Sequence, residues 1–338
     1  MKLGELDGGI SVQLSEHSAN QHIAVFGASG SGKSVRIKEL IRNAESAGET
    51  VLVFDINGTD YRECCENINW ISAVRDGMAI EFLAANAREV EFRNGYLMYI
   101  VELLSNVYHL GSKQQIILRK GVFYAAEHED EFETEDQAIK AGLEQQEEKN
   151  ADMVENKMWR FLETSILKKG SMDLQIGKVN VLTFEKIEPE LQRVLIELIL
   201  SVIWRDAQLS EERIGKLWIV LDEFQNLSLK KTSVLLQMLR EARKYGILLI
   251  LATQSVIPLS NDVKAAIGQT GTQLYFRQGT EDIRRTATMI DPQKTAYWAT
   301  RLKNLKVGES VAVGVFCIKG KTIDSPVIIK SEYKHGQV

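Results

Sequence analysis

The stretch Gly27-Ala28-Ser29-Gly30-Ser31-Gly32-Lys33-Ser34 decides the fold of this chain, because it matches the pattern G-x-x-x-x-G-K-[ST] at every fixed position. The apolar run at residues 22–26 predicts a strand before it, and residues 35–44 have the apolar spacing of an amphipathic helix. Glycines let the backbone curl so that its N–H groups and the helix N-terminus converge on phosphates. The stretch therefore predicts a loop that binds a nucleoside triphosphate.

The residues of this loop have separate expected roles. We expect Lys33 to neutralise the β- and γ-phosphates, and Ser34 to place its hydroxyl on Mg²⁺, a hard cation that takes few protein ligands. The expected nucleotide contacts of the loop are Gly27, Ala28, Ser29, Gly30, Ser31, Gly32, Lys33, Ser34 and Val35. ATP and Mg²⁺ are therefore the expected cofactors.

The composition is that of an ordinary globular protein. The chain has 338 residues, of which 44% are hydrophobic and 26% charged, which is enough to bury a large core. No stretch approaches the roughly 18 apolar residues that cross a bilayer, and the first residues do not form a hydrophobic signal segment, so we expect a cytoplasmic protein without a membrane partner. The net charge of -5 does not exclude nucleic acid, because a ring-shaped motor needs positive charge only along its channel.

Strand and helix patterns alternate along the chain. Further strands are predicted at 50–55, 179–184, 217–221 and 247–252, and a core helix at 191–204. Continuous apolar strands separated by helices indicate an α/β fold with a mostly parallel sheet flanked by helices. We divide the chain into a first part of the core (1–83), a helical insertion (84–170) and a second part of the core (171–338).

Two features of the sequence favour plain structural interpretations. The acidic residues 127–150 predict a solvated face or a mobile loop, with a partner surface as the alternative. Cys64 and Cys65 are adjacent and Cys317 is distant, so there is neither a C-x-x-C metal pair nor a disulfide framework. We expect buried or idle thiols.

A second constellation is the apolar run of residues 217–221 followed by Asp222 and Glu223. A strand that delivers two acids at its carboxyl end places them where open α/β sheets bind ligands, beside the glycine loop. We expect Asp222 to hold the hydration shell of Mg²⁺ and Glu223 to orient or deprotonate the water that attacks the γ-phosphate. The alternative is a strand that simply ends in solvated acids. Together with the glycine loop, the pair predicts an ATPase.

At these residues the chain resembles the HerA/FtsK superfamily of ring-forming DNA-pumping ATPases, and the HerA branch most. The blocks that carry the resemblance are the strand and loop at 22–34, Val53-Phe54-Asp55 with Gly58 and Tyr61, and Arg240 to Ile247 running into Leu251-Ala252-Thr253-Gln254. The resemblance covers most of residues 20–318, with weak support in the helical insertion. It implies a RecA-like core, a homo-oligomeric ring, with six subunits as the expected number and ATP sites at subunit junctions, and translocation of double-stranded DNA.

The resemblance also implies roles for four further residues. Arg243 is the first candidate for an arginine finger that reaches a neighbouring subunit's γ-phosphate, and Arg277 is the second; the alternative for Arg243 is a plain surface or salt-bridge arginine. Gln254 suits a sensor of the γ-phosphate or the water, against simple loop hydrogen bonding. Asp55 either organises the site or forms the turn before Asn57-Gly58.

The chain also departs from the family pattern. Members of the HerA branch usually carry an N-terminal β-barrel, and here we expect it to be missing or reduced to a strand around residues 10–14. Gln21 stands where the family often has an arginine. The loop at residues 229–231, with Lys230 and Lys231, is a candidate for the lining of the DNA channel, although a Lys-Lys pair is more often a solvated turn.

Three classes of function remain open at this point. The first is a DNA translocase or helicase that works with a nuclease or another effector in DNA end processing or antiviral (anti-phage) defence. The second is a DNA-pumping ATPase of conjugation. The third is an ATP-binding ring scaffold that regulates a bound effector enzyme without moving DNA. DNA-stimulated ATP turnover separates the first two from the third.

Overall fold

The computed structural model describes residues 1–338 except 16–17, 19, 84–89, 147–150, 211–214 and 332–338. The chain forms two compact units. The first unit comprises Met1–Trp70, Gln175–Leu182 and Arg213–Val338, and the second comprises Ile71–Leu174 and Thr183–Glu212. The helical insertion predicted over residues 84–170 falls within the second unit.

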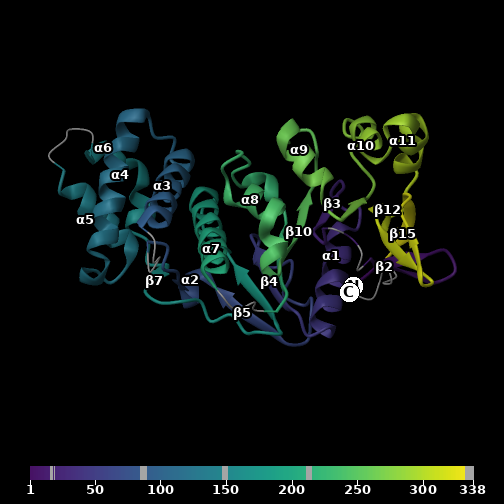
Figure 1. Ribbon diagram of the computed structural model, residues 1–338, viewed down its shortest axis with the longest axis horizontal. Coiled ribbons are helices and arrows are strands. Elements are labelled where there is room, and N and C mark those ends of the chain that lie inside the picture. The colour runs from purple at the N-terminus through teal and green to yellow at the C-terminus, as the bar shows by residue number, and fades with distance from the viewer. Residues whose placement is uncertain (16–17, 19, 84–89, 147–150, 211–214, 332–338) are drawn as a thin grey trace. The chain divides into compact units, whose positions relative to one another are not determined.

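The glycine loop of the first unit lies between β3 (Ile23–Phe26) and α1 (Lys33–Ser46), as predicted. Every residue of β3 is buried, because parallel neighbours flank it on both sides: β10 (Ile247–Thr253) and β11 (Thr272–Tyr275). Next to β10 lies β9 (Leu217–Leu221), and next to β9 lies β4 (Thr50–Asp55), again parallel. The residues that follow these strands therefore meet at one edge of the sheet (Figure 1).

Beyond β11 the sheet becomes antiparallel, which the sequence did not predict. It continues in the order β12, β15, β1, β2, β13, β14. The strand expected at residues 10–14 is β2. Short connections can join only antiparallel neighbours, which explains why the closely spaced terminal strands pair in this way. The bounds are β1 Lys2–Leu6, β2 Ile10–Leu14, β12 Glu309–Gly314, β13 Phe316–Ile318, β14 Lys321–Ile323 and β15 Val327–Lys330.

The helix before β10 has a buried apolar face. In α8 (Val234–Glu241), Leu235, Leu236 and Leu239 are buried. The α-helix ends at Glu241 and continues as the 3-10 helix η3 (Ala242–Tyr245), which Gly246 closes at φ +80°. The remaining helices of this unit are η2 Phe224–Asn226, α9 Asn261–Gly268, α10 Ile283–Ile290, η4 Pro292–Lys294 and α11 Thr295–Lys303, and α10 packs against α11.

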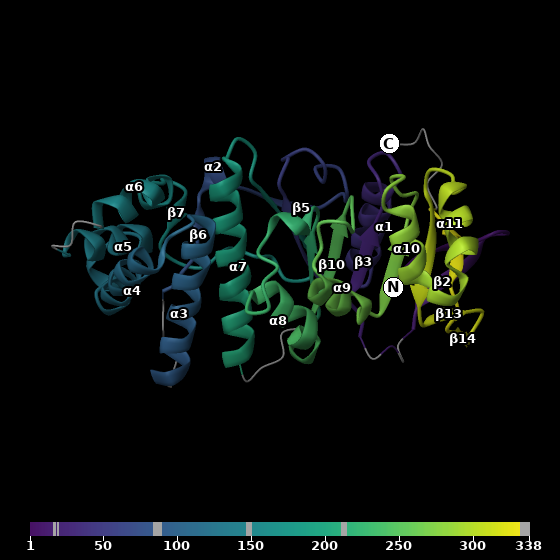
Figure 2. The same cartoon turned by 90° about the horizontal axis from the view of Figure 1, so that it is seen from above.

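The second unit is mainly helical (Figure 2). Its helix α3 packs against both α4 and α7, and α5 packs against α4 and α6. Gly142 of α5 lies so close to α4 that an added Cβ would come within 2.5 Å of the Gly121 carbonyl oxygen. The bounds are α2 Ala73–Asp76, β6 Met78–Ala79, α3 Val90–Val107, α4 Ser112–Glu127, η1 Glu129–Glu131, α5 Glu135–Glu144, α6 Ala151–Leu162, β7 Leu167–Lys168 and α7 Pro189–Leu209. The large sheet continues beyond β4 with β8 Val179–Thr183 and ends at the edge strand β5 Ile68–Ser72, and most residues of both strands belong to the first unit.

The acidic segment 127–150 contains packed structure. In α5, Ile139 and Leu143 are buried while acidic side chains such as Glu144 are exposed, so this part is a helix with a solvated face and not a loop. Residues 147–150 lie outside the described part of the chain. Among the described residues, no helix combines the length and the apolar character needed to span a bilayer. All three cysteines are free thiols.

Candidate active site

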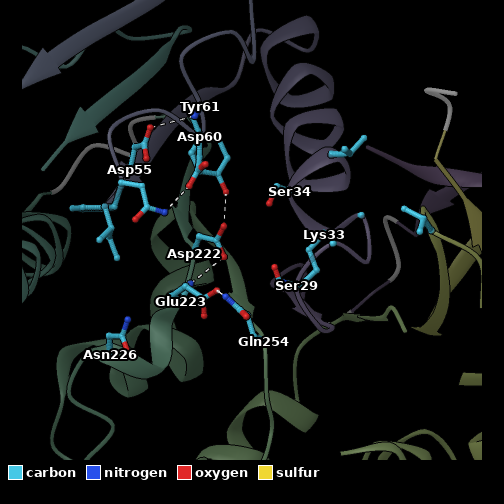
Figure 3. Close-up of a pocket in the computed structure, with 17 residues that line it drawn as sticks. Ser29, Lys33, Ser34, Asp55, Asp60, Tyr61, Asp222, Glu223, Asn226 and Gln254 are labelled. Atoms are coloured by element: carbon cyan, nitrogen blue, oxygen red, sulfur yellow. Dashed lines mark hydrogen bonds between the residues drawn. The ribbon is translucent and has the colours of Figure 1, made fainter. Parts of the chain in front are cut away.

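A pocket of about 460 Å³ lies at the carboxyl ends of the parallel strands of the first unit (Figure 3). The glycine loop, the start of α1 and the segments that follow β4, β9 and β10 line it. Ser29, Lys33 and Ser34 enter it from the loop and the helix. Asp222 and Glu223 enter from the end of β9. The fold thus brings together the two constellations expected from the sequence.

The loop needs glycine at specific positions. A Cβ on Gly27 would lie 2.6 Å from the Cβ of Phe276, and Gly30 and Gly32 have φ angles of +70° and +103° that L side chains rarely adopt. The N–H of Ala28 donates to the Arg277 carbonyl oxygen at 2.9 Å, which ties the loop to the residue after β11. This curled backbone before a helix N-terminus fits the phosphates of a nucleotide.

Lys33 is 7% exposed and lies among acidic groups. Burial lowers the pKa of its ammonium group, and the carboxylates of Asp222 and Glu223 act in the opposite direction. A buried lysine beside carboxylates is suited to receive phosphate oxygens, because the site has already removed much of its water.

Asp222 accepts a hydrogen bond on each carboxylate oxygen. The backbone N–H of Glu223 donates to Oδ1 at 3.0 Å, and the Tyr61 hydroxyl donates to Oδ2 at 3.0 Å. Burial raises the pKa of Asp222, and the Glu223 carboxylate adds to this rise. The Ser34 hydroxyl lies in the same pocket, so the donor set of hard oxygens fits Mg²⁺, whose charge would offset the two acids.

Glu223 has an unusual backbone and two amide partners. Its φ and ψ angles are 55° and 42°, in the left-handed region that few non-glycine residues occupy. The side-chain amide of Gln225 donates to Oε2 at 2.6 Å, and that of Gln254 donates to Oε1 at 2.5 Å. Gln254 thus lies against the expected catalytic carboxylate, in the same pocket (Figure 3).

Asp55 lines the pocket and also forms the turn. Its Oδ1 accepts from the N–H of Gly58 at 2.9 Å and its Oδ2 from the N–H of Tyr61 at 3.2 Å. Its side chain is 1% exposed, and burial raises its pKa while these backbone donors lower it. Both interpretations offered for Asp55 therefore agree with its position.

The two candidate arginines lie outside the pocket of their own chain. Arg243 is exposed on η3, which leads into the first residue of β10, so it lies at the amino ends of the parallel strands. Arg277 is exposed after β11 and contacts the glycine loop through its main chain. Among the described residues, neither side chain lines the pocket, so a finger role requires a neighbouring subunit and stays a prediction.

The lysine pair proposed for the DNA channel is exposed. Lys231 forms an ion pair with Asp262 at 3.3 Å, which offsets part of its charge. Its role in DNA binding stays a prediction.

Sequence reasoning assigned no role to several residues of the site. Tyr61 belongs, with Asp55 and Gly58, to one of the blocks that carry the family resemblance, but its contact with Asp222 was not anticipated. Val307 lines the pocket because the N–H of Gly308 donates to the Ser31 carbonyl oxygen at 3.0 Å and docks this distant segment on the glycine loop. No local pattern marks Val307. The other lining residues without an assigned role are Phe54, Ile56, Asn57, Asp60 and Asn226.

Comparisons with known proteins match most of the chain. The family model described as "Helicase HerA, central domain" matches residues 1–203, and the model described as "Type IV secretion-system coupling protein DNA-binding domain" matches residues 160–293. The DNA double-strand break repair helicase HerA of Saccharolobus solfataricus is 21% identical, over 100% of this chain and 69% of that protein. Its counterpart from Sulfolobus acidocaldarius is 22% identical, over 100% and 70%.

Solved structures share the fold. VirB4 of Thermoanaerobacter pseudethanolicus has a TM-score of 0.76 at 18% identity, and the match covers 99% of this chain and 97% of the VirB4 chain. The bacterial conjugative coupling protein TrwBdeltaN70 has a TM-score of 0.66 at 15% identity, covering 98% and 89%. TrwB in complex with ADP and Mg²⁺ has a TM-score of 0.62 at 16% identity, covering 93% and 85%. These likenesses confirm the RecA-like α/β architecture.

Proposed function

Because this chain belongs to the family of the HerA helicase central domain and is a P-loop ATPase, we propose that it hydrolyses ATP to move along double-stranded DNA. The observation that carries the proposal is the convergence of Lys33, Asp222 and Glu223 in one pocket beside a curled glycine loop. The HerA relatives are named as DNA double-strand break repair helicases, which supports DNA as the track.

The residues of the pocket divide the chemistry among them. Bound magnesium supplies positive charge to the phosphates, and Ser34 and Asp222 are the residues that would hold it. Lys33 binds the phosphates from the loop. Glu223 orients the attacking water and accepts its proton. Gln254 donates a hydrogen bond to Glu223 and is proposed to sense the γ-phosphate or the attacking water.

The proposal includes a ring, with six subunits as the expected number. Arg243 is proposed to reach the nucleotide of the neighbouring subunit, with Arg277 as the second candidate. Both side chains are exposed and lie outside the pocket of their own chain, so they are free to reach the pocket of a neighbouring subunit. There a planar guanidinium would stabilise the charge of the transition state once the ring has formed.

DNA contact is proposed through phosphates, since a translocase must tolerate every sequence. Binding should therefore weaken steeply with salt, with a slope set by the number of phosphates neutralised. Replacement of Lys230 and Lys231 by alanine together should reduce that slope if their loop faces the channel. An unchanged slope would reject this loop.

We place the protein in the cytoplasm with a nuclease or another effector, in DNA end processing or anti-phage defence. A conjugation-type DNA pump is the second candidate. It is favoured by the match of residues 160–293 to a coupling-protein DNA-binding domain and by the fold shared with TrwB and VirB4. The ring scaffold that binds ATP without translocation is the remaining alternative.

The deciding experiment measures ATP turnover and displacement of a triplex-forming strand from duplex DNA by the same preparation. A DNA translocase shows turnover that duplex DNA stimulates and strand displacement that requires hydrolysable ATP. Turnover that DNA does not change, with no displacement and no DNA affinity at low salt, would replace the motor by the scaffold.

A further inference from the structure

The Asp222 carboxylate is held by a residue far away in the sequence. Its Oδ2 accepts from the hydroxyl of Tyr61 at 3.0 Å, across 161 residues of chain, and its Oδ1 accepts from the adjacent Glu223 N–H (Figure 3). The second bond follows from local geometry, because donor and acceptor are neighbours in the chain. The first depends on where the fold places Tyr61.

Tyr61 is itself fixed from two sides. Its backbone N–H donates to Asp55, whose other carboxylate oxygen accepts from Gly58, so the turn after β4 is tied down at both of its ends. Because β4 and β9 pair in parallel with Phe54 opposite Leu221, Asp55 and Asp222 follow neighbouring strands at the same edge. The turn therefore returns the tyrosine over the end of β9.

The ring and the hydroxyl of Tyr61 have separate surroundings. The side chain is 1% exposed and belongs to the hydrophobic cluster that contains Val53 and Val220. The hydroxyl leaves this cluster and donates to Asp222. An ionised carboxylate can only accept hydrogen bonds, so the phenol hydroxyl is the donor in this pair. A phenylalanine would keep the packing and remove only the bond.

We propose that Tyr61 is a positioning residue, which fixes the Asp222 carboxylate in the orientation that receives the hydrated magnesium of the nucleotide complex. This inference rests on the proposed ATPase function of the pocket. A carboxylate with one oxygen tied by a rigid phenol presents its remaining lone pairs in one direction, which reduces the reorganisation needed when the cation enters. Tyr61 acts through Asp222 and needs no contact with the nucleotide.

The experiment compares Tyr61→Phe with Tyr275→Phe. Tyr275 is a matched control, because it is fully buried in the same unit, donates its hydroxyl to Gln273 at 2.8 Å and does not line the pocket. Binding of a fluorescent ATP analogue is measured in EDTA and during a Mg²⁺ titration. For Tyr61→Phe we expect unchanged affinity in EDTA and an approximately tenfold higher Mg²⁺ concentration for half-maximal tightening, the usual size for loss of an outer partner of a metal ligand. Tyr275→Phe should keep the wild-type Mg²⁺ dependence.

Turnover supplies a second readout. At saturating Mg²⁺ the kcat of Tyr61→Phe should return towards the wild-type value, because the carboxylate itself is still present. In an Asp222→Asn background, Tyr61→Phe should add little further loss, since the two residues act on the same step. Independent, additive losses would overturn the proposal, as would a wild-type Mg²⁺ dependence in Tyr61→Phe or an equal shift in Tyr275→Phe.

A second variant keeps the test decisive if Tyr61→Phe does not fold. The two carboxylate oxygens of Asp55 accept from the N–H groups of Gly58 and Tyr61, and in Asp55→Asn an NH₂ group replaces one of these oxygens. The turn then holds Tyr61 less firmly, while the Tyr61 hydroxyl remains. Its Mg²⁺ requirement should rise in the same direction, and an unchanged requirement would reject the role of the turn. Wild-type protein that binds nucleotide without any Mg²⁺ effect would instead refute the ATPase assignment, whereas failure of DNA movement alone leaves the Tyr61 measurement valid.

Discussion

Replacement of Glu223 by glutamine tests the chemical assignment of the pocket most directly. The change keeps the shape of the side chain and removes its charge and its ability to accept a proton. General-base and water-orienting groups contribute about 10²- to 10⁴-fold to turnover, so we expect kcat to fall at least about 100-fold, which corresponds to about 2.7 kcal/mol in the barrier. Nucleotide affinity should change little, because Lys33 and the glycine loop remain.

The structure also sets the cost of this substitution in stability. Both carboxylate oxygens of Glu223 accept from glutamine amides, those of Gln225 and Gln254. In Glu223→Gln one of these donors faces an NH₂ group, so one charge-assisted bond is lost, at a cost of about 1 kcal/mol. The left-handed backbone of residue 223 is equally unfavourable for both side chains. The variant should therefore stay folded at assay temperature.

The assay measures steady-state phosphate release and equilibrium binding of a fluorescent ATP analogue on the same preparations. The control is Glu241→Gln, which makes the same chemical change at an exposed residue outside the pocket that pairs with Lys244 at 3.5 Å. It should hydrolyse ATP at the wild-type rate. If Glu223→Gln also does so while binding nucleotide normally, Glu223 is not the catalytic carboxylate and the assignment is wrong.

Three further outcomes are expected. Lys33→Ala should lose ATP binding, seen as loss of the ATP-induced rise in thermal stability; a rise of wild-type size would contradict the role of Lys33. Mixed rings of Arg243→Ala and Glu223→Gln subunits should recover part of the ATPase activity that each variant lacks, and inactivity at all mixing ratios, or a fully active monomer by light scattering, would count against a finger from a neighbour. Burial lowers the pKa of His22 from 6.5 to about 4, so the folded state binds fewer protons than the unfolded state between these values. The free energy of unfolding is therefore about 3 kcal/mol higher above pH 6.5 than near pH 4, because protonation of the buried imidazole is unfavourable in the folded state. In His22→Asn the side-chain carbonyl can replace the imidazole as acceptor of the Leu249 N–H. Chemical unfolding of this variant should lack this component of the pH dependence.

The sequence by itself determined the elements whose cause is local. The glycine loop can be recognised in the sequence because the close approach of Phe276 to Gly27 and the positive φ angles of Gly30 and Gly32 disfavour other residues. Apolar runs bounded by turns fixed the parallel strands, and the position of Asp222 and Glu223 directly after one of them placed the acids at the ligand edge of the sheet. Chain connectivity enforces these features in any fold of this class.

Only the tertiary structure decided what distant segments bring to the site. Tyr61 reaches Asp222 because β4 and β9 are adjacent in the sheet, and Val307 reaches the pocket because Gly308 docks on Ser31; in both cases the partners lie far apart in the sequence. The antiparallel extension beyond β11 depends likewise on which edges of the sheet remain unpaired after the core has formed. Such contacts arise from packing and hydrogen bonding between elements, which leave no periodic or local signal along the chain.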